Sequence, residues 1–316
     1  MLRLKNFMAN LYLGVEIGGT KLQLVLGLAS GEIVERTRLS VDSLRGGSGI
    51  RDQIKEALPG LIRGRPIVAG GVGFGGPVDC KTGVIECSHQ IEGWSGFALG
   101  PWLEAQINAP VGVENDANTA AFGEALVGAG RGLNPVFYVT LGSGVGGGLV
   151  VDGKVYHGRS PGEAEFGHLR LDRNGVIIES RCSGWAVDRR IRTAIMGEPE
   201  GVLARLAAGR DRGEARFLRP ALDQGDLLAR RLLSEVAEDL ALGLSHVVHL
   251  CHPSVVVLGG GLSLIGEPLR LAVATELPRF VMHAFALGPR IELAGLGEDA
   301  VPVGALLLAE KLGFGR

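Results

Sequence analysis

Residues 136–153 read VFYVTLGSGVGGGLVVDG: an apolar strand, a glycine-rich turn, a second strand and a polar Asp-Gly turn. The same order occurs earlier in the chain, where residues 11–31 read LYLGVEIGGTKLQLVLGLASG. Two copies of one layout predict a duplicated core, with the second turn spanning Gly142–Gly148. Because a strand and not a helix follows each glycine turn, the pattern argues against a dinucleotide-binding unit.

The glycine turns are candidate phosphate sites. Glycine lets backbone N–H groups approach an anion closely, and hydroxyl or ammonium groups nearby add further donors. Glu16, just before the first turn, offers a carboxylate that can hold Mg²⁺ directly or through water. An ordinary glycine hairpin explains either turn alone, but the duplication favours a polyphosphate site. The residues expected to contact phosphate groups at the two turns are Gly18, Gly19, Thr20, Lys21, Thr140, Gly142, Ser143, Gly144 and Gly146. A further glycine stretch, Gly259, Gly260 and Gly261, ends the apolar run 254–258 and is a candidate contact for an adenosine or its phosphates.

A third stretch, residues 111–127 (VGVENDANTAAFGEALV), predicts a short strand, an acidic corner and a helix of small residues. A carboxylate at such a corner is rigidly placed and can act as a general base toward a bound hydroxyl. Asp116 is our candidate for that base. The alternative is that Asp116 only caps the helix, as Asp often does. The neighbouring glycine turns favour the catalytic interpretation.

Two further loops carry candidate ligand contacts. The predicted strand Pro66–Gly73 opens into a Gly-Gly-Pro loop, and open α/β sheets bind ligands at such strand ends. Residues 162–168 (GEAEFGH) bring Glu163, Glu165 and His168 together beside glycines. Solvated charges with a hydrogen-bonded histidine are the alternative for this second loop.

Helices are expected over Ile50–Ile62 and Ala300–Leu312, and the second of these is expected to pack on a core.

The histidine-rich sequence HVVHLCH, residues 246–252, invites a metal-site interpretation. His246 and His249 share a helical face, whereas Cys251 and His252 fall at the helix end before Pro253. No carboxylate completes a ligand set, so we expect a helix end in the core and not a metal site.

Composition excludes several classes of protein. The chain has 316 residues, 46% of them hydrophobic, a net charge of −2 and only 5% aromatics. This length suffices for two lobes, each with a core. Near-neutral charge and few aromatics argue against nucleic-acid partners and anionic membranes. Four cysteines without CxxC spacing, together with no long apolar run, predict a cytoplasmic protein.

Seven segments together resemble the ROK family of sugar kinases, within the actin-like ATPase superfamily. In family order they are VEIGGTK, GFGGPVD, VENDANTAA, VTLGSGVGGGLVVDG, AEFGH, ESRCSGWA and VVLGGGLS. The resemblance covers nearly the whole chain. It implies an α/β, two-lobed actin-like (ribonuclease H-like) fold with a duplicated mixed-sheet core and a cleft between the lobes. A small lobe of residues 1–115, joined by a helix at about 300–316, and a large lobe of residues 116–299 are implied, as is a homodimer.

The resemblance also implies roles. Gly18–Thr20 match the first phosphate loop, Gly142–Gly146 the second and Gly259–Gly261 an adenosine-side loop. Asp116 matches the catalytic base of an ATP- and Mg²⁺-dependent kinase acting on a hexose, at its primary hydroxyl. The positions that match sugar contacts are Gly75, Gly76, Gln90, Asn115, Glu165, His168 and Glu179.

Two positions and one longer segment depart from the family pattern. Glu16 stands where Asp is common, and Gln90 in HQIEGW stands where Asn is frequent, which leaves the sugar open. Residues 169–182, LRLDRNGVIIESRC, lack the family's CxCGxxGC motif, so no structural zinc site is expected although His168, a family zinc ligand, is present. Glucose, fructose, mannose, allose and N-acetylated hexosamines are all compatible.

Two other functions remain as alternatives. One is a sugar-responsive regulator, a class known in the family. Its usual helix-turn-helix segment is not expected here, because the first strand starts at about Leu11. The other is a catalytically weak protein that binds sugar and ATP, against which the intact Asp116 argues.

Overall fold

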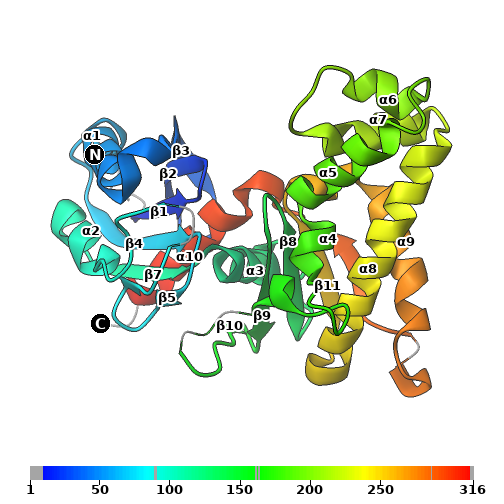
Figure 1. The fold of residues 1–316 in the computed structure, drawn as a ribbon. Coiled ribbons are helices and arrows are strands. Elements are labelled where there is room, and N and C mark those ends of the chain that lie inside the picture. The colour runs from blue at the N-terminus through cyan, green and yellow to red at the C-terminus, as the bar shows by residue number, and fades with distance from the viewer. Residues whose placement is uncertain (1–9, 89–90, 161, 163, 286, 314–316) are drawn as a thin grey trace, which may run out of the picture. The chain divides into compact units, whose positions relative to one another are not determined.

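The computed structural model describes residues 10–88, 91–160, 162, 164–285 and 287–313 (Figure 1). These residues divide into two compact units, each built around one five-stranded mixed sheet. Unit 1 contains the described residues within 1–123, 157–163 and 299–316, and unit 2 those within 124–156 and 164–298. The helix that follows the acidic corner therefore begins in unit 1 and ends in unit 2.

Unit 1 combines the predicted N-terminal strands with the closing helix. Its strands are β1 (Leu11–Ile17), β2 (Lys21–Gly27), β3 (Ile33–Ser40), β4 (Ile67–Phe74), β5 (Val78–Asp79), β6 (Val84–Ile85) and β7 (Val111–Asn115). Its helices are α1 (Gly46–Ile62), α2 (Leu99–Ile107), the start of α3 (Asp116–Val127) and α10 (Ala300–Gly313). The sheet order is β3-β2-β1-β4-β7, antiparallel from β3 to β1 and parallel from β1 to β7.

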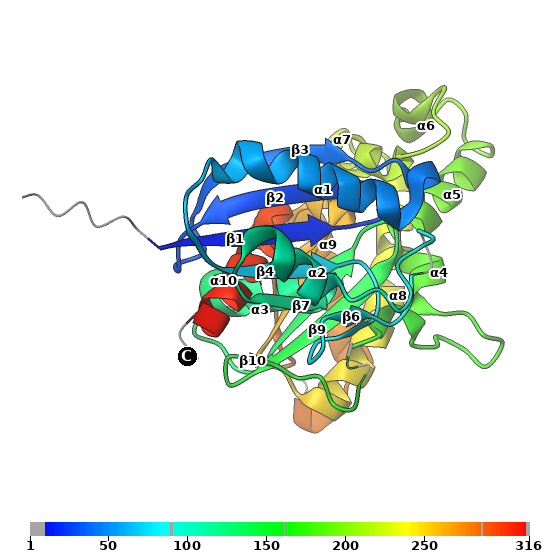
Figure 2. The ribbon, with the colours of Figure 1, turned by 90° about the vertical axis from the view of Figure 1, so that its left-hand side faces the viewer.

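Both faces of this sheet are buried, which explains why β1, β2 and β4 are apolar runs and not alternating sequences. Leu13, Val15 and Ile17 pack with α1 and α2 on one face. Tyr12 packs with Leu306 of α10 on the other. Figure 2 shows α1 running along the sheet.

Glycines seat α10 against the sheet. A Cβ at Gly71 would lie 2.0 Å from the Ala305 carbonyl oxygen, and one at Gly27 would lie 2.3 Å from a Leu306 methyl. Gly304 of α10 sits equally close to the backbone of Thr119 in α3. Side chains at these positions would hold the helix away from the sheet, so α10 packs here only because they are absent.

Unit 2 repeats the same topology. Its sheet order is β10-β9-β8-β11-β12, antiparallel from β10 to β8 and parallel from β8 to β12. The strands are β8 (Val136–Leu141), β9 (Val145–Val151), β10 (Lys154–Val155), β11 (Val255–Gly259) and β12 (Arg290–Leu293). The helices are α4 (Ile178–Cys182), α5 (Gly184–Ile195), α6 (Val202–Ala207), α7 (Leu218–Asp223), α8 (Leu227–Cys251) and α9 (Glu267–Glu276). The duplicated core predicted from the two glycine turns is confirmed.

The second glycine turn is shorter than predicted. The strand resumes at Val145, so only Gly142–Gly144 form the turn and Gly146–Gly148 are paired with β8. A Cβ at Gly147 would lie 2.8 Å from the Ala164 carbonyl oxygen. Gly147 therefore serves close packing against the segment at Ala164, a tertiary requirement that the local sequence does not reveal.

The histidine-rich helix end lies at the surface and not in the core. α8 ends at Cys251, and His252 adopts the left-handed conformation with φ of 44°. His246 and His249 are exposed, and the His249 ring accepts a hydrogen bond from the Met282 N–H at 3.1 Å. The predicted helix end is therefore confirmed, but the prediction that it lies in the core is wrong.

In the part of the chain that the structure describes, every helix is too short or too polar to cross a lipid bilayer.

Candidate active site

The corner between β7 and α3 is capped by Asn115. The Asn115 Oδ1 accepts the N–H groups of Ala117 at 2.8 Å and Asn118 at 3.1 Å. The Asp116 Oδ1 also lies 2.8 Å from the Ala117 nitrogen. Asp116 is therefore the first helical residue and Asn115 is its N-cap. Asn is a preferred N-cap residue, so this assignment was available from the sequence and was missed.

A buried carboxylate supports the same corner. Glu114 is 5% exposed, and its Oε1 accepts the Asn115 N–H at 2.9 Å and the Asn118 side-chain amide at 3.1 Å. Its Oε2 lies 2.6 Å from His157 Nε2. Glu114 and His157 were not predicted from the sequence, because 43 residues separate them and no local pattern joins them.

The Gly75–Gly76 loop lies against Asp116. Gly75 donates its N–H to the Ile17 carbonyl at 2.8 Å, and Asn115 donates its side-chain amide to the Gly76 carbonyl at 3.2 Å. A Cβ at Gly75 would lie 3.4 Å from the Asp116 Oδ2 and 3.6 Å from the Gly18 Cα. The structure thus brings the candidate base, the Gly-Gly-Pro loop and the first glycine turn together in unit 1.

A small hollow that is open to solvent lies beside these residues. Its lining comes from the first glycine turn, the end of β4 and the segment after β6: Ile17, Gly18, Gly19, Phe74, Gly75, Ser88, Ile91 and Trp94.

The first glycine turn is a tight turn with a charged pair at its base. Gly18 donates its N–H to the Lys21 carbonyl at 2.9 Å. The Lys21 ammonium lies 3.3 Å from the Glu16 Oε2, to which Gln23 donates its side-chain amide at 2.6 Å. Thr20 is exposed beside this pair. The Thr20 hydroxyl, the Lys21 ammonium and the Glu16 carboxylate therefore lie within one short segment of the chain.

In unit 2 the second glycine turn is held by Glu179. The Glu179 Oε2 accepts the Val145 N–H at 2.9 Å, and a Cβ at Gly144 would lie 2.6 Å from that oxygen. On its other side the Gly142 carbonyl accepts the Gly184 N–H of α5 at 2.7 Å. Thr140 is half-buried at the end of β8, and Ser143 is exposed at the tip of the turn.

Glu165 and His168 lie near the start of β9 at Val145. His168 Nδ1 is 3.2 Å from the Glu165 Oε2, and both side chains are more than half exposed. Between them, Gly167 packs so closely that a Cβ would lie 2.1 Å from the Val145 carbonyl oxygen. Glu179 contacts the N–H of Val145 and Gly167 contacts its carbonyl. The predicted sugar residues of unit 2 therefore gather around Val145.

The third glycine stretch touches the second. Gly260 has φ of +80°, and a Cβ there would lie 2.6 Å from the Leu141 backbone nitrogen. Gly259 pairs with Thr140, and Gly261 opens the short helical turn that follows. Two of the three predicted nucleotide segments are thus adjacent in unit 2. Gln90 and Glu163 lie outside the described residues.

The family model for the ROK family matches residues 12–312. The chain belongs to the ROK family. A glucokinase of Streptomyces coelicolor is 33% identical, with 95% of this chain and 98% of the relative covered. A glucokinase of Halalkalibacterium halodurans is 30% identical, with 95% of each chain covered.

Among solved structures, a ROK family glucokinase from Streptomyces griseus, crystallised with glucose and AMPPNP, superposes with a TM-score of 0.85. The two chains are 33% identical, and the comparison covers 96% of this chain and 100% of the other. The two mixed sheets of repeated topology, together with this match, give the chain the actin-like ATPase fold of ROK kinases.

No structural zinc site is expected at His168, because residues 169–182 lack the CxCGxxGC motif. Cys182, next to the site of that motif, is buried with its Sγ 3.9 Å from the Val236 carbonyl oxygen. Burial raises the pKa of the Cys182 thiol, which disfavours the thiolate that a metal needs. Among the described residues, His168 belongs to no cluster of three potential metal ligands.

Gly75→Ala is expected to lower kcat/KM about 10–100-fold without unfolding unit 1. The added methyl meets Asp116 and Ile17 at ordinary contact distances of 3.4 Å, so the fold accepts it. It would stand beside the Asp116 carboxylate, however, where we expect the reacting hydroxyl to approach. Steady-state kinetics and thermal unfolding check this together.

The matched control for this prediction is Gly60→Ala in α1, where a Cβ has nothing within 4 Å. Normal kinetics in Gly75→Ala, or the same kinetic loss in both variants, would contradict the placement of the reacting hydroxyl.

Proposed function

We propose that this protein is a sugar kinase that transfers the γ-phosphate of ATP to the primary hydroxyl of a hexose, with Asp116 as general base. The observation that carries the proposal is the position of Asp116. Its carboxylate starts a helix and lies beside Gly75, which is itself hydrogen-bonded to the strand that leads into the first glycine turn. The ROK kinase relatives support the same reaction class.

Phosphoryl transfer requires mainly positioning and charge compensation. As the sugar oxygen forms its bond to the γ-phosphorus, the bond from phosphorus to the bridging oxygen of ADP breaks and Asp116 takes the hydroxyl proton. The Ala117 N–H on Asp116 Oδ1 fixes the carboxylate, and the start of α3 favours its negative charge. The Asp116 carboxylate is thus oriented before the proton arrives.

The glycine turns supply donors for the phosphates. We assign Gly18–Thr20 and Gly142–Gly146 to the polyphosphate and Gly259–Gly261 to the adenosine side. Lys21 adds a positive charge at the first turn.

A magnesium ion fits at Glu16, the last but one residue of β1, because Mg²⁺ prefers carboxylate and phosphate oxygens. When bound, the ion would neutralise charge on the phosphates. Gln23 and Lys21 both contact the Glu16 Oε2 and so fix the orientation of that carboxylate.

Sugar recognition is assigned to Asn115, Glu165, His168 and Glu179, together with Gly75, Gly76 and Gln90. Asn115 already uses its carbonyl oxygen for two backbone N–H groups and one amide N–H for Gly76. Its remaining amide N–H is therefore the group we assign to a sugar hydroxyl. Glu165 and His168 are exposed enough to meet a ligand directly.

We further propose that the protein is a homodimer, is located in the cytoplasm and has no nucleic-acid partner. Four thiols and no disulfide suit a reducing compartment, and a net charge of −2 does not favour nucleic acid. Sedimentation velocity checks the dimer. The regulator alternative is not favoured, because the relatives matched over nearly the full chain are named as kinases.

The test is ADP release against glucose, fructose, mannose, allose and N-acetylhexosamines, with Mg²⁺ and with EDTA. We expect turnover with at least one hexose, abolished by EDTA. Nucleotide binding without turnover on any sugar would instead support the catalytically weak alternative and reject the kinase.

A further inference from the structure

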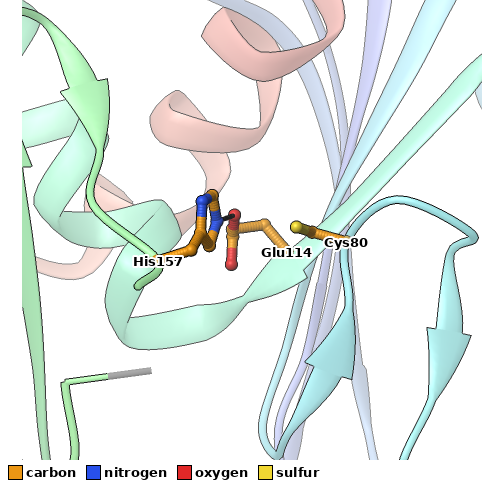
Figure 3. Close-up of side chains that lie close together, drawn as sticks. All are labelled: Cys80, Glu114 and His157. Carbon is orange, nitrogen blue, oxygen red and sulfur yellow. Dashed lines mark hydrogen bonds and ion pairs between the residues drawn. The ribbon is translucent and has the colours of Figure 1, made fainter. Parts of the chain in front are cut away.

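Three side chains with metal-ligating atoms converge in unit 1, away from any role in the proposed phosphoryl transfer (Figure 3). Cys80 follows β5, Glu114 lies in β7, and His157 follows β10. One ligand atom of each, the Cys80 sulfur, a Glu114 oxygen and a His157 ring nitrogen, lies within 4.8 Å of the other two. The three residues come from distant parts of the sequence, so the fold alone assembles them.

We propose that Cys80, Glu114 and His157 form a binding site for a divalent transition-metal ion, with zinc as the ion that fits best. Zinc is bound in proteins by cysteine thiolate, histidine nitrogen and carboxylate oxygen. Magnesium and calcium, in contrast, take oxygen ligands almost exclusively. A mixed sulfur, nitrogen and oxygen set therefore selects against the ion that a kinase uses with ATP.

Glu114 is oriented for this role by its other oxygen. The Oε1 accepts two hydrogen bonds, from the Asn115 N–H at 2.9 Å and the Asn118 amide at 3.1 Å. These bonds direct Oε2 toward His157, 2.6 Å from Nε2. Such outer partners fix the orientation of metal-ligating carboxylates and are part of functional metal sites.

The distance between Glu114 and His157 shows how the side chains must move when an ion binds. Ligands at about 2.0–2.3 Å from a tetrahedral zinc ion stand roughly 3.3–3.7 Å apart. The 2.6 Å contact between Glu114 and His157 is a hydrogen bond, so His157 must move outward by about 1 Å as the ion replaces the proton between them. The His157 side chain is 34% exposed, and His157 lies outside helices and strands.

Ion binding also releases the thiol proton of Cys80, because the thiolate is the ligand. Three protein ligands leave a fourth position for water. The ion would join the segment after β10 to the corner that carries Asp116, beside the bond from Asn118 to the Gly162 carbonyl at 3.4 Å. The site shares no residue with the family zinc motif or with His168.

The experiment is titration of the full chain with Co²⁺, whose thiolate complexes absorb in the near ultraviolet by sulfur-to-metal charge transfer. We expect one equivalent to bind with that absorption, Zn²⁺ to displace it and Mg²⁺ to leave it unchanged. Cys80→Ser should abolish the absorption, and His157→Asn should weaken Co²⁺ binding at least tenfold.

Cys87→Ser is the matched control, since Cys87 is also half-buried in unit 1 but lies outside the cluster, and it should retain the absorption. Circular dichroism verifies that each variant is folded. If Cys80→Ser does not fold, His157→Asn provides a second test of the site. No charge-transfer band in the wild type, or a band that survives in Cys80→Ser or disappears in Cys87→Ser, would overturn the proposal.

Discussion

Asp116→Asn is expected to lower kcat about 10²–10⁴-fold while sugar binding stays within about tenfold, the effect of losing a general base. The substitution keeps the shape of the side chain, and its amide oxygen can still accept the Ala117 N–H that Asp116 accepts at 2.8 Å. Asn115 remains the helix cap. Stability should therefore hardly change, and the loss should appear in the chemical step.

Single-turnover kinetics with saturating sugar, together with calorimetric sugar binding, measure the two effects separately. Asp52→Asn makes the same chemical change on the exposed surface of α1, where Asp52 lies 3.8 Å from Arg45, and should leave both quantities unchanged. Weakened sugar binding with normal turnover at saturation would mean that Asp116 is a binding group and not the base.

Gly260→Ala is expected to destabilise unit 2 by about 2–5 kcal/mol, the sum of backbone strain and an overpacked contact. The backbone at Gly260 has φ of +80° and ψ of 176°, a conformation that is nearly exclusive to glycine. The new Cβ would also lie 2.6 Å from backbone atoms of Leu141, which cannot move aside as a side chain can. Thermal unfolding should shift downward by on the order of 5–15 °C.

Gly261→Ala separates this packing effect from nucleotide contact. A Cβ at Gly261 has nothing within 4 Å, so the melting temperature should stay close to that of the wild type. Because we assign Gly261 to the adenosine side, weaker ATP binding is still expected. Equal melting temperatures for the two variants would show that Gly260 is not tightly packed in solution.

The two apolar runs that lead into the duplicated glycine turns, residues 11–17 and 136–141, could be predicted to the residue. β1 and β8 have the expected bounds, because an apolar run closed by glycines leaves little freedom in placing its end. The second turn was predicted too long, since the strand glycines after Val145 look identical to turn glycines in sequence. Only the close contact of Gly147 with Ala164 distinguishes them.

The positions of the candidate site residues were predictable where their signal is local. Asp116 and the glycine turns stand at strand ends that can be recognised from short segments. The contact of Glu179 with Val145 spans 34 residues, and that of Glu114 with His157 spans 43, so neither has a local signal. The binding roles assigned to Glu179, Glu114 and His157 remain predictions.

The seat of α10 has a consequence for synthesis of the chain. Unit 1 takes this helix from residues 300–313, after every residue of unit 2 has been made. During synthesis, the face of the unit 1 sheet that carries Gly27 and Gly71 therefore stays uncovered until α10 is made. By then all residues of unit 2 have been synthesised. Exposed sheet surface of this kind is a target for chaperones and a start point for aggregation. A nascent chain that stalls before residue 300 should thus present a folded second half and an unfinished first half to the quality-control machinery.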